Sequence, residues 1–309
     1  MIDVKKPIKF GFKSLILTII LTVALVFVIY SPNLTYQSIN NQDSSVITNY
    51  GIDHIVIIVD ENRPFSALVN NSKAPYINQL IGQGSYAANY MAVSKNPYIA
   101  LTSGSLTHIP NSCNPQIAKC QTLVANITDE IEASGRTWDM YAESMPKSCD
   151  FKDTKKYTVR HNPFLFYPSI SGNVKQCKNQ IVSYGDLQSD MDSKSLPNYV
   201  FISPNLCNDM HSCDINTGDK WLSQNVPKIL SSYAFTKQKS LLIITWDEGS
   251  QHDNRVLTIF LGPAAKQGYI SHKPYNHYSV LHTVESVWKL RPLTSNDKNA
   301  LIMNDMLKN

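Results

Sequence analysis

Residues 54–60 read HIVIIVD, a run of β-branched apolar residues that ends in a carboxylate. Short apolar runs of this kind are typical of strands that are buried on both faces of a parallel sheet. Two similar runs follow later in the chain, YVFIS at 199–203 and SLLIITW at 240–246. We therefore expect these three segments to be strands of one mainly parallel sheet.

Between these runs the chain alternates between helix-like and strand-like patterns. The segment at 127–135 (ITDEIEASG) predicts a helix that is capped by Asn126 and Asp129 and ends at Gly135. Further helices are expected at 74–84, 219–235 and 278–290, and further strands at 86–93, 136–144 and 256–263. The alternation predicts an α/β fold whose mainly parallel central sheet carries helices on both faces. The stretch at 144–192 lacks clean periodicity and is expected to be a loop-rich insertion.

The N-terminal region carries a membrane signal. Residues 14–30 read SLILTIILTVALVFVIY without a charge, and four lysines precede them. The positive-inside rule then predicts a cytoplasmic basic tail at 1–13, a transmembrane anchor at 14–30, a polar linker at 31–52 and an exported domain at 53–309. The alternative is a cleaved signal peptide, although no clear small-x-small cleavage site follows. Both interpretations place the domain outside the cytoplasm.

All six cysteines lie beyond this apolar segment, and their number is even. Outside the cytosol such a set is typical of disulfides. Short loop spacing favours Cys113–Cys120 and Cys207–Cys213, which leaves Cys149–Cys177. A cysteine zinc site is the alternative, but the chain contains no C-x-x-C pair.

The formal charge of +4 comes mainly from the lysines of the N-terminal tail. The remainder of the chain is close to neutral, and phosphate-backbone binding requires basic residues gathered on one face. We therefore expect no nucleic-acid partner, and no obligate protein partner is evident from the sequence.

Polar side chains follow each of the three apolar runs. Asp60, Glu61 and Asn62 end the first, and Asp247 and Glu248 end the third. The second is followed by a group of four polar residues, Asn205, Asn208, Asp209 and His211. Ligands of open parallel sheets bind beyond the carboxyl ends of the strands, and carboxylates and imidazoles are metal ligands. One acidic strand end is commonly a helix cap or a salt bridge, whereas three that converge predict a metal or phosphate site.

A possible nucleophile lies in the segment SKNPYIALTSG at 94–104. If a strand runs into a turn and then a helix here, Ser94 lies at a helix N-terminus, where backbone N–H groups favour phosphate. A serine in that position can attack phosphorus when a metal lowers its pKa. The alternative is that Ser94 is an ordinary helix N-cap.

Several short stretches, in this order, resemble one known family. They include HIVIIVDENRPF, APYINQLIGQG, ALTSG, WDMYAESMP, YTVRHNPFLFY, PNLCNDMHSC, TGDKWL, LIITWDEG and YNHYSVLHTVE. The chain resembles the phosphoesterase family that holds secreted acid phosphatases and phosphatidylinositol-type phospholipases C, a branch of the alkaline phosphatase superfamily. The resemblance spans about residues 54 to 287, is closer to the acid phosphatase branch, and implies an alkaline-phosphatase-like three-layer sandwich.

The resemblance also implies roles for individual residues. It places the nucleophile at Ser94 and two active-site histidines at His161 and His277. The implied metal ligands are Glu61, Asn62, Asp247 and Glu248 at a first site and Asp209 and His211 at a neighbouring one. Asp219 is implied as a further ligand, or alternatively as the N-cap of its helix. Asn62 and Arg160 are implied phosphate contacts.

One segment departs from the family pattern. Close relatives read Ser-Leu-Pro-Asn-Tyr at the nucleophile, whereas this chain reads Ser94-Lys95-Asn96-Pro97-Tyr98. The asparagine that steadies the transferring phosphoryl oxygen is therefore displaced, unless Asn96 reaches it from a shifted loop. Lys95 adds a positive charge that partly compensates.

The predicted function is metal-dependent hydrolysis of phosphate monoesters by a serine nucleophile outside the cytoplasm, with Mg²⁺, Ca²⁺ or Zn²⁺ as cofactor. The expected substrate is a phosphorylated small molecule or a lipid head group. One alternative is a phospholipase C or phosphodiesterase that acts on lipid head groups. The other is a catalytically weak, phosphate-binding surface protein, which the altered nucleophile segment favours.

Overall fold

The computed structural model describes residues 50–107, 109–110 and 113–308. The predicted basic tail, the predicted membrane anchor and residues 31–49 of the predicted linker lie outside these ranges. Within them, no helix combines the length and apolar character that crossing a membrane requires. Tyr50 and Ile52, just before the predicted border at residue 53, are buried, and Trp288 Nε1 donates to the Ile52 carbonyl.

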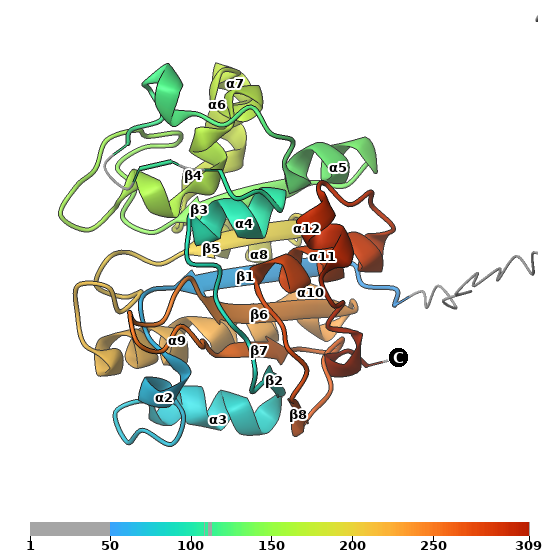
Figure 1. Cartoon of the computed structure of the whole chain (residues 1–309). Coiled ribbons are helices and arrows are strands. Elements are labelled where there is room, and N and C mark those ends of the chain that lie inside the picture. Colours follow the sequence, from blue (N-terminus) through green and yellow to red (C-terminus); the bar gives the residue numbers. More distant parts are fainter. Residues whose placement is uncertain (1–49, 108, 111–112, 309) are drawn as a thin grey trace, which may run out of the picture. The chain divides into compact units, whose positions relative to one another are not determined.

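The described residues form an eight-stranded sheet in the order β4-β3-β5-β1-β6-β7-β2-β8 (Figure 1). Strand β7 is antiparallel to both of its neighbours, and all other neighbouring strands are parallel. The strands are β1 (His54–Asp60), β2 (Ser85–Ala87), β3 (Trp138–Ala142), β4 (Ile181–Ser183), β5 (Tyr199–Ser203), β6 (Ser240–Trp246), β7 (Thr258–Leu261) and β8 (Tyr269–Ser271). The mainly parallel α/β sheet predicted from the sequence is confirmed.

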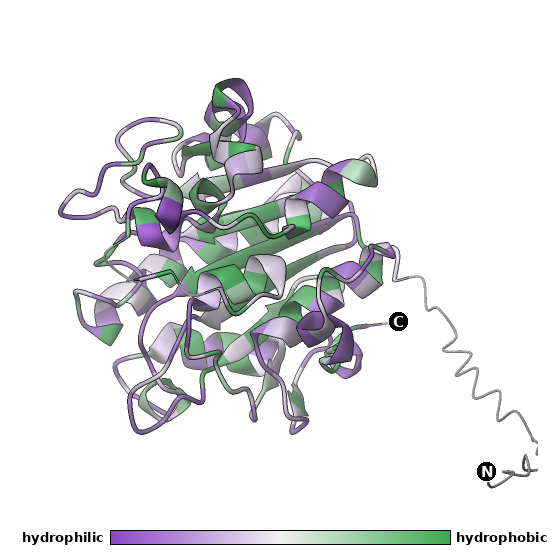
Figure 2. Ribbon diagram, turned by 45° about the horizontal axis from the view of Figure 1, so that its top comes forward, coloured by the Kyte–Doolittle hydropathy of each residue, from purple (hydrophilic) through white to green (hydrophobic). Residues whose placement is uncertain are grey.

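Strand β1 lies between β5 and β6, and every residue of these three strands is buried. Figure 2 shows these strands coloured as hydrophobic, with polar residues mostly in the surrounding loops. Asp60 at the end of β1 is level with Trp246 at the end of β6. The residues that follow the parallel strands therefore meet at one edge of the sheet.

Helices cover both faces of the sheet (Figure 1). On one face α3 (Pro75–Gln83) packs on α9 (Ile215–Ser231), with α8 (Asp186–Asp192) and α10 (Tyr233–Thr236) beside it. The other face carries α4 (Pro97–Ser103), α5 (Ile127–Ala133), α11 (His277–Trp288) and α12 (Ser295–Asn299). The remaining helices are α2 (Phe65–Leu68), α6 (Pro168–Ser171), α7 (Val174–Gln180), η1 (Ala118–Cys120), η2 (Val159–His161), η3 (Pro163–Phe166) and η4 (Asn304–Met306).

The predicted cap of α5 is confirmed, since Asn126 and Asp129 form a capping box. The prediction that Asp219 is the N-cap of its helix is wrong. Helix α9 begins earlier, with Asp214 as its N-cap, and Asp219 lies inside it. The Asp219 carboxylate instead accepts hydrogen bonds from the backbone N–H groups of Tyr76 (3.2 Å) and Ile77 (2.8 Å), in the first turn of α3. The Asp219 carboxylate thus provides hydrogen-bond acceptors for two free N–H groups at the N-terminus of α3.

Two expected segments have a different structure. The strand expected at 86–93 is reduced to the three residues of β2 and two isolated bridges at Tyr90 and Met91. The stretch at 144–192 is more ordered than a loop-rich insertion, because it holds several short helices and β4, an outer strand of the sheet. All three predicted disulfides are present: Cys113–Cys120, Cys149–Cys177 and Cys207–Cys213.

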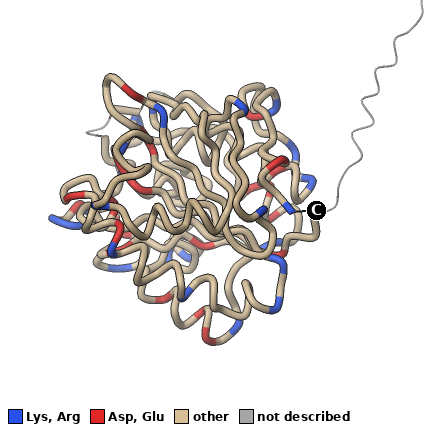
Figure 3. The backbone as a smooth tube through the Cα atoms, turned by 90° about the horizontal axis from the view of Figure 1, so that it is seen from below, with Lys and Arg blue, Asp and Glu red and all other residues tan. Residues whose placement is uncertain are grey.

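Charged residues are interspersed around the domain. Figure 3 shows Lys and Arg scattered among Asp and Glu over the domain. Several acidic side chains are buried instead, and one of them lies in helix α11. Glu285 of α11 is fully buried, and neither of its carboxylate oxygens has a hydrogen-bond partner among the described residues. Burial and the nearby charge of Asp297 raise the pKa of Glu285 to about 9.

The raised pKa predicts a pH-dependent stability. Between about pH 4.5 and 9 the folded state keeps a proton on Glu285 that the unfolded state has lost. The free energy of unfolding should therefore fall as pH rises through this window, by up to about 1.4 kcal/mol per pH unit from this group. We expect Glu285→Gln to flatten this slope and to stabilise the protein at pH 8, as measured by urea denaturation from pH 5 to 9. The exposed Asp192→Asn is the control, and an unchanged slope in Glu285→Gln would contradict the assignment.

Candidate active site

A cavity of about 320 Å³ opens at the edge of the sheet where the parallel strands end. Its polar wall contains most of the residues singled out by the sequence: Glu61, Asn62, Ser94, Lys95, Asn96, Arg160, His161, Asp247 and Glu248. An apolar wall completes the lining, formed by Pro97, Ile99, Ile109, Pro110 and Phe166. Residues from distant parts of the chain therefore meet at a single concave site.

The ends of β1 and β6 are joined directly. Asn62 has a left-handed backbone (φ 46°), and its N–H donates to Asp247 Oδ1 at 3.0 Å. The N–H of Glu248 donates to the same oxygen at 2.6 Å. Two backbone donors thus orient the Asp247 carboxylate, so the carboxylates after the two strands are held on the same cavity wall.

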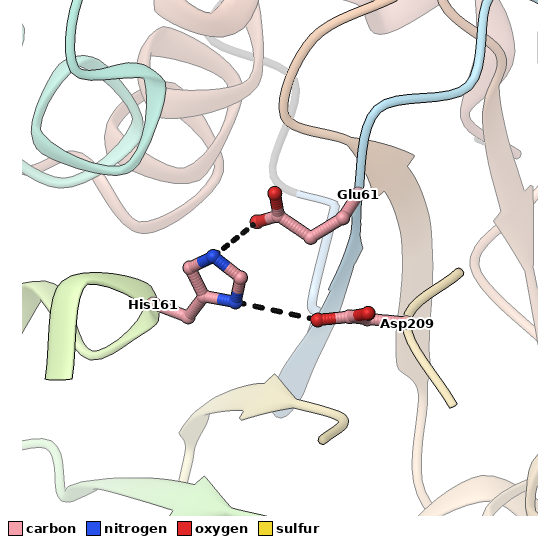
Figure 4. A group of neighbouring side chains, drawn as sticks. All are labelled: Glu61, His161 and Asp209. Atoms are coloured by element: carbon pink, nitrogen blue, oxygen red, sulfur yellow. Dashed lines mark ion pairs between the residues drawn. The ribbon is translucent and has the colours of Figure 1, made fainter. Parts of the chain in front are cut away.

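His161 connects this wall to the segment after β5 (Figure 4). Its Nε2 lies 3.2 Å from Glu61 Oε1, and its Nδ1 lies 3.3 Å from Asp209 Oδ2. Tyr98 stacks on the imidazole and donates a short hydrogen bond to the same Glu61 oxygen. The sequence predicted two neighbouring sites, one with Glu61 and one with Asp209. In the structure the two are joined through His161.

Burial makes this cluster electrostatically unfavourable as it stands. Desolvation and the neighbouring carboxylates raise the pKa of Glu61 well above its usual value. Desolvation also raises the pKa values of Asp209 and Asp247 to about 7 each. Burial and the charge of Arg160 lower the pKa of His161 well below its usual value. A neutral imidazole carries one proton, so it cannot donate to both Glu61 and Asp209, and a proton or a cation must compensate the remaining charge.

The donor set fits a divalent cation. Glu61, His161 and Asp209 each offer an atom within 4.8 Å of the other two, and all three residues are buried. Asn62 Oδ1 is buried without a hydrogen-bond partner among the described residues, and the contact of Asp209 Oδ2 is the ion-pair distance of 3.3 Å to His161 Nδ1. Carboxylate and amide oxygens with one imidazole suit Mg²⁺, Ca²⁺ or Zn²⁺. A cation between these atoms would bind the unpaired Asn62 oxygen and relieve the repulsion between the carboxylates.

Both ring nitrogens of His211, a predicted metal ligand, have side-chain partners. Its Nε2 is 2.9 Å from Arg160 Nη2, and its Nδ1 is 3.1 Å from Ser212 Oγ. Because a guanidinium only donates, His211 Nε2 must be the acceptor and the proton must be on Nδ1. The ring therefore orients Arg160, which lines the cavity, instead of presenting a free nitrogen to a cation.

His277 is also placed behind the cavity wall. It is fully buried, its Nδ1 accepts from the N–H of Val93 at 2.9 Å, and its Nε2 is 3.1 Å from the Trp246 carbonyl. Desolvation lowers the pKa of His277 to about 4, which keeps the ring neutral. Both nitrogens are thus used on the backbone, one beside Ser94 and the other beside Asp247. These contacts suit a positioning role, and the direct role in catalysis that the sequence predicts for His277 stays a prediction.

Ser94 lies at the open side of the cavity. Helix α4 begins at Pro97, and its N-cap is Asn96, which has a left-handed backbone (φ 46°). Ser94 is therefore two residues before the cap, and the expectation that it is itself the N-cap is wrong. The Asn96 side chain donates to the Thr107 carbonyl at 2.5 Å, while Lys95 is exposed and has no polar partner among the described residues.

Several contacts fix the segment that carries Asp209. The Cys207–Cys213 disulfide closes it, and Arg63 Nη2 donates to the carbonyls of Met210 (2.7 Å) and Cys213 (2.9 Å). Met210 is fully buried with a left-handed backbone (φ 75°), a strained conformation for a residue with a side chain. The Met210 side chain packs on Gly218 of α9, where a Cβ atom would overlap it.

Three polar residues that contact the site were not assigned from the sequence. They are Tyr98, Arg63 and Asn254, and the last donates to the Ser94 hydroxyl at 3.1 Å. Tyr98 and Arg63 stand within quoted motifs, but only the folded chain shows their partners. Asn254 lies in the connection after β6, where no local pattern marks it.

Comparison with known proteins identifies the Phosphoesterase family, whose model matches residues 69–291. The chain is 30% identical to the phosphatidylinositol-3-phosphatase of Mycobacterium tuberculosis, and the match covers 82% of each chain. It is 27% identical to a phosphate-repressible acid phosphatase of Penicillium chrysogenum, over 84% of this chain and 63% of the fungal one.

Solved structures show the same fold. A protein of the alkaline phosphatase superfamily from Vibrio parahaemolyticus matches with a TM-score of 0.55 at 14% identity, over 77% of this chain and 66% of that one. The lipoteichoic acid synthase LtaP from Listeria monocytogenes also matches with a TM-score of 0.55, at 10% identity, over 82% and 78%. The predicted three-layer architecture is therefore confirmed.

The packing of Met210 on Gly218 predicts the effect of one added methyl group. Gly218→Ala should displace Met210 and with it the neighbouring Asp209. We expect a loss of about 1–3 kcal/mol in the free energy of unfolding, measured by urea denaturation. The control is Gly82→Ala in α3, where an added Cβ meets nothing within 4 Å. If the two variants are equally stable, the Met210 side chain does not pack tightly against Gly218.

Proposed function

This chain belongs to the Phosphoesterase family and is a phosphoric ester hydrolase, and on that premise we propose that it hydrolyses phosphate monoesters through Ser94 with a divalent cation. The single observation that carries the proposal is the convergence of Glu61, Asp247 and Ser94 on one cavity. Buried carboxylates with unsatisfied charge and a hydroxyl on the same wall are the parts that phosphoryl transfer needs.

The cation would be held by Glu61, Asn62, Asp209, Asp247 and Glu248, with His161 between two of these carboxylates. When bound, it supplies Lewis-acid stabilisation of negative charge on the phosphoryl oxygens and favours the ionised form of a nearby hydroxyl. The Mg²⁺, Ca²⁺ and Zn²⁺ ions remain candidates, since oxygen donors dominate the set.

The reaction follows two displacements at phosphorus. In the first, Ser94 Oγ forms a bond to phosphorus as the bond to the leaving oxygen breaks. The hydroxyl proton of Ser94, which faces the open side of the cavity, passes to water, and the leaving oxygen takes up a proton from water. In the second, water attacks the phosphoserine, the P–Oγ bond breaks, and Ser94 regains a proton while inorganic phosphate leaves.

Arg160 is the residue proposed to bind the transferring phosphoryl group. It lines the cavity, and His211 fixes one of its nitrogens, so the remaining N–H donors have a defined direction. Asn62 and Asn96 contribute amide groups to the same wall. Lys95 is exposed at the mouth without a partner among the described residues, which suits it to an anionic group of an incoming substrate.

The leaving group would lie on the apolar wall. Ile109, Pro110 and Phe166 line the same cavity as the charged wall, and they offer contact area for an alkyl or aryl group. The mycobacterial relative is named for a phosphoinositide, so a lipid head group and a phosphorylated small molecule are both proposed substrates.

Three disulfides support an oxidising location outside the cytoplasm. Membrane tethering through residues 14–30 is proposed from the sequence alone.

The covalent mechanism predicts that Ser94→Ala lowers kcat for p-nitrophenyl phosphate by at least roughly 10³-fold, because the acceptor for the phosphoryl group is removed. EDTA should abolish the same activity, and one added divalent metal should restore it. The measurement is steady-state release of p-nitrophenol, with Ser231→Ala on the surface of α9 as the control. Full activity of Ser94→Ala together with loss on chelation would replace the covalent step by direct attack of water.

A monoesterase should also discriminate against diesters. We expect kcat/KM for p-nitrophenyl phosphate to exceed that for bis(p-nitrophenyl) phosphate by roughly 10²-fold or more. A diester carries two free phosphoryl oxygens instead of three and one negative charge instead of two, so it would bind Arg160 and the cation more weakly. The assay compares the two substrates at equal leaving-group chemistry. A preference for the diester would favour the phospholipase C alternative, and no turnover of either would favour a phosphate-binding protein.

A further inference from the structure

Asn254 makes three side-chain hydrogen bonds, two of which connect the turn after β6 to the Ser94 segment. Its Oδ1 accepts from the N–H of Gly249 at 2.9 Å. Its Nδ2 donates to the Ala92 carbonyl at 2.9 Å and to Ser94 Oγ at 3.1 Å. The backbone of Asn254 adds a fourth contact, because its carbonyl accepts from the N–H of Ala92 at 2.9 Å.

The orientation of this amide is determined by its backbone partners. The Gly249 N–H can only donate and the Ala92 carbonyl can only accept, so the Asn254 oxygen and nitrogen cannot be exchanged. One hydrogen of Nδ2 is used on Ala92, and the other points at Ser94 Oγ. The Ser94 hydroxyl is therefore the acceptor in this contact, and its own proton is free to leave.

We propose that Asn254 positions and activates Ser94: its amide donor fixes the hydroxyl oxygen in the cavity and stabilises the alkoxide that attacks phosphorus. This inference rests on the proposed function, since it assumes that Ser94 is the nucleophile. A fixed donor that faces a developing negative charge favours the ionised form without reorganising during the reaction.

The same connection also links Ser94 to the candidate metal ligands. Asp247 and Glu248 immediately precede the turn, and Gly249 accepts no side chain because a Cβ atom would overlap the Asp253 carbonyl. The Ser250 hydroxyl accepts from the N–H of Asp253 at 3.1 Å and closes the turn. One rigid segment thus carries two carboxylates at its start and the donor to the nucleophile at its end.

The test compares Asn254→Asp and Asn254→Ala with the wild-type chain. The aspartate keeps an acceptor for Gly249 but loses the donor to Ser94 and places negative charge against its oxygen. The matched control is Ser250→Ala, which removes a hydrogen bond from the same turn without touching Ser94. Each variant is assayed for p-nitrophenyl phosphate turnover, for melting temperature, and for covalent labelling of Ser94 by a fluorophosphonate, read by intact mass.

We expect both Asn254 variants to lower kcat by roughly 10²-fold, with the aspartate at least as impaired as the alanine. KM should change by less than about threefold, and the labelling rate of Ser94 should fall in parallel with kcat. Ser250→Ala should keep wild-type kcat and labelling. A loss in all three variants that follows the melting temperature would overturn the inference, because the contact would then be purely structural.

Labelling separates this inference from the proposed function. If the wild-type chain labels at Ser94 in an Asn254-dependent way but turns over no monoester, the activation of Ser94 stands and the proposed function fails. If monoesters are hydrolysed while the Asn254 variants match Ser250→Ala, the function stands and the inference fails. If Ser94→Ala retains turnover and Ser94 does not label, both the covalent step and the inference are wrong.

Discussion

The crowding of buried carboxylates at the end of β1 is the constraint on which the rest of the site depends. Glu61, Asp209 and Asp247 are removed from water at a single edge of the sheet, and their negative charges oppose one another. A fold can maintain such a cluster only if protons or a cation neutralise it. The position of β1 between two fully buried strands keeps these groups from moving apart.

Around this cluster, residues that do not line the cavity determine where the lining residues lie. His277 links the backbone before Ser94 to the backbone before Asp247, and Arg63 binds two carbonyls of the Asp209 segment. Because these contacts are made to the backbone, they fix the positions of the cavity-lining side chains without occupying the cavity. Their arrangement explains how a site assembled from loops can keep its geometry before a substrate arrives.

The sequence predicts the framework of this protein well because buried strands and cysteines leave local signals. The runs at β1, β5 and β6 identified both the sheet and the edge where the polar residues meet, and loop spacing gave the disulfides. The roles of individual side chains were harder to predict. His211, His277 and Asp219 are polar residues of the expected type, but their partners are 51, 31 and 143 positions away in the chain. A local sequence pattern does not predict contacts with such distant partners. Only the fold shows that these three side chains bind Arg160 or the backbone.

The Cys207–Cys213 bond has a consequence for where this chemistry can take place. The bond closes the short segment that carries Asp209, in which Met210 holds an unfavourable backbone conformation. A chain kept under thiol-reducing conditions would lose that covalent restraint, and the strained segment would be freer to relax. The covalent restraint on the Asp209 segment therefore forms only where a newly made chain meets an oxidising environment.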